Sequence, residues 1–206
     1  LFVAAVRAAL GEATVLHGVD AMPPKNGITE EQLLTELGAN TDLSVDHATQ
    51  LLEDPNVGFA YLSQRVFSPG AYRARDLRVH IQKRPPWSAT EKAQQFFTSS
   101  GTNHMVIGYY HAGYEKPFLR LIQDRGFDSG LAIKGEEGTS HFTLRLGLPS
   151  NDGRQAMNFV QGYRTINRQS ERVETDVDPA LYGFHYDQNP RLEVISLRSF
   201  LDAGIA

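Results

Sequence analysis

The most informative segment of the chain is MVIGYYHAGYEKPFLRLIQDRGF, residues 105–127. Its first seven residues are rich in the β-branched and aromatic side chains that favour strands. Pro117 then stands where a first helical residue would be, and Arg125 with Gly126 gives a basic last turn and a stop. The segment therefore predicts a strand ending at His111, followed by a helix. The apolar face of that helix is formed by Phe118, Leu121 and Ile122.

Downstream of this unit, the sequence predicts alternating strands and helices. Residues 141–146 alternate like a strand, and Asp152 can cap a helix with a buried stripe of Phe159, Val160 and Tyr163. The polar stretch 165–179 is interpreted as a loop. Residues 192–195 predict a last core strand, which leads into a short helix with a stop at Gly204.

Upstream of the unit, capping residues predict helices. Thr29 with Gln32 forms a capping box and Gly38 stops that helix, while Ser44 caps a second one that ends at Asp54-Pro55. A third helix is expected from Ser88, with Glu91 at the box position and Ala93, Phe96 and Phe97 along it. Between them, residues 77–81 alternate like a half-buried strand.

The fold class that these elements predict is α+β. We expect a single domain over residues 1–206, in which a mainly helical lobe, residues 1–100, packs on a β-rich core, residues 101–206. The core should hold a mixed, mainly antiparallel split sheet. The size, 206 residues, is ordinary for one domain.

Composition excludes several classes of protein. The chain has no cysteine, so disulfides, thiolate zinc sites and a cysteine nucleophile are excluded. With a net charge of -4, we expect no nucleic-acid partner. No apolar run is long enough to span a bilayer, so we expect a soluble chain with no membrane partner. Arg73, Arg75, Arg78, Lys83 and Arg84 are interpreted as a solvated face, with a phosphate-binding role as the alternative.

The order of strand, histidine, helix and glycine resembles the histidine-tyrosine-glutamate branch of the ADP-ribosyltransferases, which includes diphtheria-toxin-like toxins. The matching residues are Tyr110-His111-Ala112-Gly113, the helix from Pro117 to Arg125, and Gly126-Phe127. This resemblance implies that His111, with Tyr110 and Gly113 beside it, holds NAD. It also implies that Glu193, in the late strand, is the catalytic carboxylate that stabilises the transition state as nicotinamide leaves.

The chain departs from the family pattern at two points. Ala112-Gly113 replaces Gly-Thr, and Phe142 is the only aromatic residue on the strand where the family places a stacking ring. A competing placement uses His17 of Thr14-Val15-Leu16-His17-Gly18, with Tyr61 as the stacking ring. The alternative for this placement is that His17 ends an ordinary strand and Tyr61 is core.

Other catalytic motifs are weak in this sequence. His185-Tyr186-Asp187 has a His-x-Asp form, but no later histidine completes a metal triad, so we expect no metal. No Gly-x-Ser-x-Gly elbow, Walker loop or Gly-x-Gly-x-x-Gly fingerprint occurs.

The resemblance implies a mono-ADP-ribosyltransferase of the toxin or effector type, which transfers ADP-ribose from NAD, its substrate, to a protein acceptor. Such a protein would be secreted or translocated into a target cell; a cytoplasmic location is the alternative. The second hypothesis for function is a non-catalytic protein-interaction domain on the same or another α+β scaffold.

Overall fold

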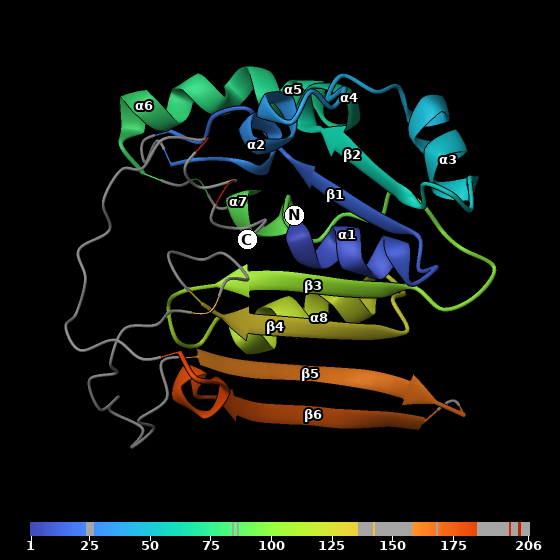
Figure 1. The fold of residues 1–206 in the computed structure, drawn as a ribbon. Coiled ribbons are helices and arrows are strands. Elements are labelled where there is room, and N and C mark those ends of the chain that lie inside the picture. The colour runs from blue at the N-terminus through green and yellow to red at the C-terminus, as the bar shows by residue number, and fades with distance from the viewer. Residues whose placement is uncertain are drawn as a thin grey trace. The chain divides into compact units, whose positions relative to one another are not determined.

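The computed structural model describes residues 1–23, 27–83, 85, 87–135, 142, 158–167, 169–184, 198 and 202. By its internal contacts the chain divides into two compact units. Unit 1 consists of Leu1–Pro85 and Glu193–Ala206, and unit 2 of Pro86–Leu192. Helices and strands occur in both, so the α+β class is confirmed (Figure 1). Whether the two units make a single domain stays a prediction.

Unit 1 is mostly helical and contains one pair of strands. Its helices are α1 (Phe2–Ala9), α2 (Glu30–Glu36), α3 (Val45–Glu53), α4 (Gln64–Phe67), α5 (Pro69–Arg73), the 3-10 turn η1 (Ala74–Asp76) and α6 (Leu77–Ile81). The strands β1 (Thr14–Gly18) and β2 (Phe59–Ser63) run parallel, with Thr14 opposite Phe59 and Gly18 opposite Ser63. In Figure 1, α1 lies on one side of this strand pair and α2, α4 and α5 lie on the other.

The two helices with the clearest capping signals are confirmed. The Thr29 side chain accepts from the Gln32 backbone N–H, and the Gln32 side chain accepts from the Thr29 backbone, which completes the capping box of α2. Gly38 follows this helix with φ +80°, where a glycine is favoured. The Ser44 side chain accepts from the His47 backbone N–H at the start of α3.

Unit 2 is built around a four-stranded sheet in the order β3-β4-β5-β6. Its elements are α7 (Trp87–Thr90), β3 (His104–Tyr109), α8 (Glu115–Asp124), β4 (Ser129–Lys134), β5 (Asn158–Ile166), β6 (Gln169–Val177) and the 3-10 turn η3 (Pro179–Tyr182). The β3–β4 pair is parallel, and the two pairs that follow are antiparallel. The sheet is therefore mixed and mainly antiparallel, as predicted.

Helix α8 covers the sheet where β3 and β4 lie side by side (Figure 1). Phe118 and Ile122 of this helix are buried in the core of unit 2 together with Ile107 of β3 and Tyr163 of β5. Gly130 lets the helix approach, because a Cβ there would lie 2.8 Å from Ile122 Cγ2. The predicted strand and helix of residues 105–125 are confirmed, although the strand ends at Tyr109, before His111, and the helix begins at Glu115, before Pro117.

Two predictions of local structure near the middle of the chain are wrong. Residues 77–81 form helix α6, not a strand, and its apolar Leu77, Val79 and Ile81 are more than 40% exposed while Arg78 is buried. A five-residue alternation is too short to separate the two periods. The helix expected from Ser88 ends at Thr90, because the chain turns so that Ala93 packs into the core of unit 2.

Two predictions in the C-terminal half are also wrong. Phe159, Val160 and Tyr163 lie in strand β5, not in a helix. Six consecutive residues of that strand, 158–163, are buried, so it lacks the alternation that identifies a strand. Residues 169–177 form strand β6, not a loop, and its exposed polar side chains hide the strand signal.

Strand β4 was not predicted at all. Apart from Phe142, the expected strands 141–146 and 192–195 lie outside the described residues.

Within the described part of the chain, no helix is long and apolar enough to cross a membrane.

Candidate functional site

The carboxyl ends of β1 and β2 form the most chemically rich part of unit 1. The two strands are parallel, so both end at the same edge of the pair. Ligands commonly bind beyond the carboxyl ends of parallel strands. Here β1 leads into Val19 and Asp20, and β2 leads from Ser63 into Arg65. We call residues 18–20 and 63–65 the carboxyl edge.

A buried glutamate from α2 lies beneath this edge. Glu31 is only 4% exposed. One of its oxygen atoms, Oε2, accepts hydrogen bonds from the Tyr61 hydroxyl at 2.9 Å and from the Ser63 hydroxyl at 3.0 Å. The other, Oε1, lies 2.6 Å from Nη2 of Arg65. One carboxylate thus joins α2, the end of β2 and the arginine that follows it.

Two members of this network, Tyr61 and Arg65, have raised pKa values. Burial raises the pKa of the Tyr61 hydroxyl well above its ordinary value, and the charge of Glu31 and the hydrogen bond to it act in the same direction. Burial opposes the charge of Arg65, but hydrogen bonds to Tyr72 and Glu31 outweigh it and raise the pKa of Arg65. Tyr61 therefore remains a donor and Arg65 remains a cation.

Asp20 links the same edge to the helices that follow β2. Its carboxylate pairs with Arg75 of η1 and accepts a hydrogen bond from the Tyr72 hydroxyl at 3.3 Å. The guanidinium of Arg75 lies 4.3 Å from the centroid of the Tyr72 ring, which adds a cation–π contact. Arg65 Nη1 lies 4.0 Å from Asp20 Oδ2. These contacts join Asp20, Glu31, Arg65, Tyr72 and Arg75 in one charged cluster.

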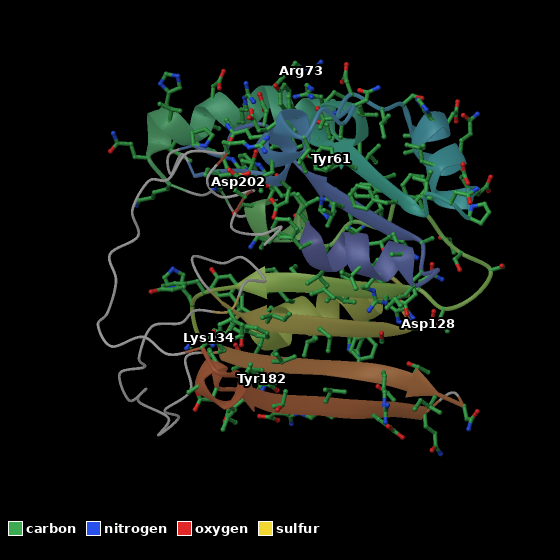
Figure 2. All side chains as sticks on the ribbon, viewed as in Figure 1. Tyr61, Arg73, Asp128, Lys134, Tyr182 and Asp202 are labelled. Carbon is green, nitrogen blue, oxygen red and sulfur yellow. The ribbon has the colours of Figure 1, made fainter. Side chains whose placement is uncertain are left out.

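The interpretation of Arg73, Arg75 and Arg78 as a solvated face is wrong for two of them. The Arg78 side chain is buried, with a residue exposure of 2%, and its Nη1 contacts the sulfur of Met22. The Arg75 side chain is 25% exposed. Figure 2 shows Arg73 on the outer side of the helical layer and Tyr61 beneath that layer. Arg73, Arg75 and Arg78 lie in three successive helical elements, α5, η1 and α6, and the last two arginines turn inward, which sequence spacing alone did not reveal.

A pocket of about 390 Å³ lies elsewhere in unit 1, at the amino end of β2. Its lining contains no titratable side chain; it consists of Ala5, Ala8, Ala9, Gly11, Pro55, Asn56, Val57 and Phe59. Such a surface offers shape but no acid, base or charge. The carboxyl edge is therefore the better candidate for chemistry.

The residues expected to hold NAD near position 111 lie in the loop after β3. Tyr110 and His111 are both exposed and contact each other edge to face, with ring centroids 5.3 Å apart. The Gly113 backbone N–H donates to Glu115 Oε2 at 2.8 Å. Phe142 is 42% exposed. Glu193 falls on residues whose structure is not described, so its proximity to His111 stays untested.

His17 and Tyr61 of the competing placement lie on the paired strands β1 and β2 of unit 1. His17 lies in β1 and contacts Phe67 edge to face, with ring centroids 5.6 Å apart. Tyr61 is 2% exposed and its hydroxyl is bonded to Glu31, so it is core, as the alternative for this placement predicted. Among the described residues there is no group of three or more metal-ligating side chains. His185-Tyr186-Asp187 lies outside them.

Sequence reasoning missed Glu31, although a signal exists. It lies three positions before the buried Leu34 on α2, so Glu31 occupies the apolar stripe of an amphipathic helix. A charge at such a position needs a buried partner. Asp20 and Arg65 carry no comparable signal, because only the parallel pairing of distant strands brings them together.

Comparison with known proteins gives distant relatives of one name. No family model matches the chain. Anthranilate phosphoribosyltransferase of Rubrobacter xylanophilus is 23% identical over 68% of the chain and 40% of its own length. The protein of the same name from Bacillus anthracis is 25% identical over 91% of the chain and 49% of its own length. The one from Bacillus cereus is 26% identical over 85% and 46%. The chain thus spans less than half the length of these relatives.

These relatives overturn the resemblance to ADP-ribosyltransferases and the toxin or effector function that it implied. The physical reason lies in the segment 105–127. A strand, a turn, a helix and a glycine stop are what any parallel β-α-β connection needs, and β3, α8 and β4 form one. The motif therefore does not identify a family. Nor do the relatives support an interaction domain without catalysis. NAD binding, a protein acceptor and the roles of His111, Glu193 and their neighbours stay untested predictions.

Proposed function

We propose that this chain is part of a phosphoribosyltransferase that joins a phosphoribosyl group to a nitrogen atom of an aromatic acid, with anthranilate as the acceptor to test first. The observation that carries the proposal is that relatives with this one name align with 68 to 91% of the chain. No second function has comparable support.

The chemistry of such a reaction fits the charges at the carboxyl edge. A phosphoribosyl donor carries phosphate groups, and an aromatic acid carries a carboxylate. Guanidinium groups recognise both kinds of oxyanion through paired hydrogen bonds. The side chains of Arg65 and Arg75 are 30% and 25% exposed, so part of each is accessible to solvent.

Carboxylates near the same edge suit the transition state. When the bond from ribose C1 to the leaving group breaks, the electron pair leaves with that group and C1 becomes electron-poor. The acceptor nitrogen then bonds to C1 and loses a proton. A carboxylate close to the developing positive charge stabilises this state more than the ground state. Asp20, whose side chain is 36% exposed, is the residue that we propose for this role.

The donor also bears on location. Phosphate groups carry charges that are costly to move out of water and into a bilayer. A phosphoribosyl donor is therefore retained where it is made, and of the two predicted locations we propose the cytoplasmic one. Fractionation of the source cells checks this: recovery of the protein mainly outside the cells would contradict it.

The direct test incubates the chain with 5-phosphoribosyl 1-diphosphate, a magnesium salt and anthranilate. We expect anthranilate to be consumed, and chromatography measures this loss. We also expect a higher melting temperature in the presence of the donor, because a ligand that binds only the folded state stabilises it. The proposal would be overturned if anthranilate were not consumed and the melting temperature did not change.

A matched pair of variants locates the reaction. Arg75→Gln removes the closer of the two arginines that pair with Asp20, and the uncompensated negative charge should repel an anionic donor, so we expect turnover to fall at least about tenfold. Arg120→Gln removes an exposed arginine of α8 that pairs with Asp124 at 2.9 Å, and turnover should be unchanged. Equal loss in both variants would place the reaction elsewhere.

A further inference from the structure

Glu31 is an unusual residue for its position, because a buried carboxylate is costly unless its bonds are satisfied. Tyr61 and Ser63 donate to Oε2 only. They fix the rotation of the carboxylate so that Oε1 is left for Nη2 of Arg65 at 2.6 Å. The hydroxyl groups thus aim Glu31, and Glu31 in turn fixes one side of the guanidinium.

The other side of the Arg65 guanidinium is less tightly engaged. Its Nε lies 3.7 Å from Asp42 Oδ1 and its Nη1 lies 4.0 Å from Asp20 Oδ2, and both distances exceed hydrogen-bond length. Within the described part of the chain, its other contact is with Tyr72, whose ring centroid lies 5.8 Å from the guanidinium carbon. A guanidinium has five N–H donors in a rigid fork, so donors remain for an incoming oxyanion. Arg75, in contrast, is bound directly to Asp20.

Glu31 holds the Arg65 guanidinium in place against the attraction of two neighbouring carboxylates. Asp20 and Asp42 both lie within 4.0 Å of Arg65, and without Glu31 the guanidinium would be free to move toward them. Because Glu31 holds Nη2, the Nε and Nη1 atoms of Arg65 stay at the end of β2, within the carboxyl edge. The strength of this hold follows from burial, since ion pairs are stronger away from water.

Resting on the proposed function, we propose that Arg65 binds an oxyanion of the substrates, either a phosphate of the donor or the carboxylate of the acceptor, and that Glu31 is the positioning residue that presents it. Glu31 itself touches no substrate. Its removal should therefore weaken binding only through Arg65.

The test is steady-state kinetics with 5-phosphoribosyl 1-diphosphate and anthranilate, each varied in turn. Glu31→Gln keeps the size of the side chain and an acceptor for Tyr61 and Ser63, but it removes the charge that holds Arg65. We expect the KM for one substrate to rise about tenfold, as for the loss of one charge-assisted hydrogen bond, with kcat changed less than about twofold. A higher KM for the donor identifies a phosphate, and a higher KM for anthranilate identifies the carboxylate.

Tyr61→Phe is the matched control, because it removes one of the two hydrogen bonds to Oε2 while Ser63 still donates to that oxygen, so the Glu31–Arg65 pair is kept. It should lower the melting temperature and leave both KM values unchanged. If Glu31→Gln behaves in the same way, the role of Glu31 is only structural and the proposal is overturned.

Variants of Arg65 keep the test decisive should Glu31→Gln fail to fold. Arg65→Gln should raise the same KM about tenfold, and Arg65→Lys, which keeps the charge but not the fork, should raise it less. In the Arg65→Gln background, Glu31→Gln should add less than about twofold, because it has nothing left to position. Unchanged KM values in Arg65→Gln would refute the inference while leaving phosphoribosyl transfer intact. An inactive wild type that binds neither substrate would instead refute the proposed function.

Discussion

At the scale of single residues, buried polar side chains in both units donate hydrogen bonds to defined acceptors. Tyr163 is 6% exposed and its hydroxyl donates to the Phe127 carbonyl oxygen at 2.9 Å. Burial, with a smaller contribution from the charge of Asp128, raises the pKa of Tyr163 to about 12. The folded protein thus keeps this proton at a pH where the unfolded chain has lost it.

This difference predicts a loss of stability in alkali. An unfolded tyrosine ionises near its ordinary pKa of about 10. The stabilisation is therefore complete below that pH and is lost progressively as the pH rises from there toward 12. We expect the free energy of unfolding, measured in urea between pH 9 and 11, to fall less steeply in Tyr163→Phe than in the wild type. Tyr182→Phe, at an exposed site, should match the wild type; parallel curves for all three proteins would contradict the assignment.

At the scale of elements, the β4–β5 pairing depends on a missing side chain. A Cβ at Gly162 would lie 2.4 Å from the Gly130 carbonyl oxygen, which belongs to the backbone of the neighbouring strand. Gly162→Ala must therefore move a strand, and we expect it to destabilise the protein by about 1–3 kcal/mol. Ser170→Ala, at an exposed position of β6, should cost little. Chemical denaturation measures both, and equal stability of the two variants would show that the sheet adapts freely.

Helix α3 depends on its cap. Ser44→Ala removes the side-chain acceptor of the His47 N–H and should lower the free energy of unfolding by about 1 kcal/mol. Ser44→Asp keeps an acceptor and adds a charge that suits a helix N-terminus, so it should retain the stability of the wild type. Thermal denaturation of the two variants distinguishes them. An Ala variant as stable as the Asp variant would mean that the bond contributes nothing.

Elements with local signals were predictable, and elements defined by their neighbours were not. The caps of α2 and α3 depend on residues three apart, so sequence alone places them. Strand β5 is buried on both faces, and β6 is polar and exposed, so neither shows the alternation of a half-buried strand. Residues 158–166 and 169–177 form strands because the two segments pair with each other.

The candidate site could not be predicted for a related reason. Asp20, Glu31, Arg65 and Arg75 belong to four different segments, and only the parallel β1–β2 pairing and the helices around it bring them together. The sequence did indicate the basic residues 73–78, but it did not show that Arg75 and Arg78 turn inward. The segment 105–127 carries the functional interpretation because it is the clearest local pattern, and it forms the connection from β3 through α8 to β4.

At the scale of the whole molecule, the paired strands of the two sheets are separated by very different lengths of sequence. Strands β5 and β6 are joined through residues 167–168, whereas residues 19–58, which include helices α2 and α3, separate β1 from β2. Closing a longer loop costs more entropy, and non-local pairing slows folding. Refolding should therefore build the hairpin early and the ion cluster around Asp20 late. Pulsed hydrogen exchange during refolding should show amide protection in β5 and β6 before β1 and β2, so that newly made chains acquire shape before they acquire a binding surface.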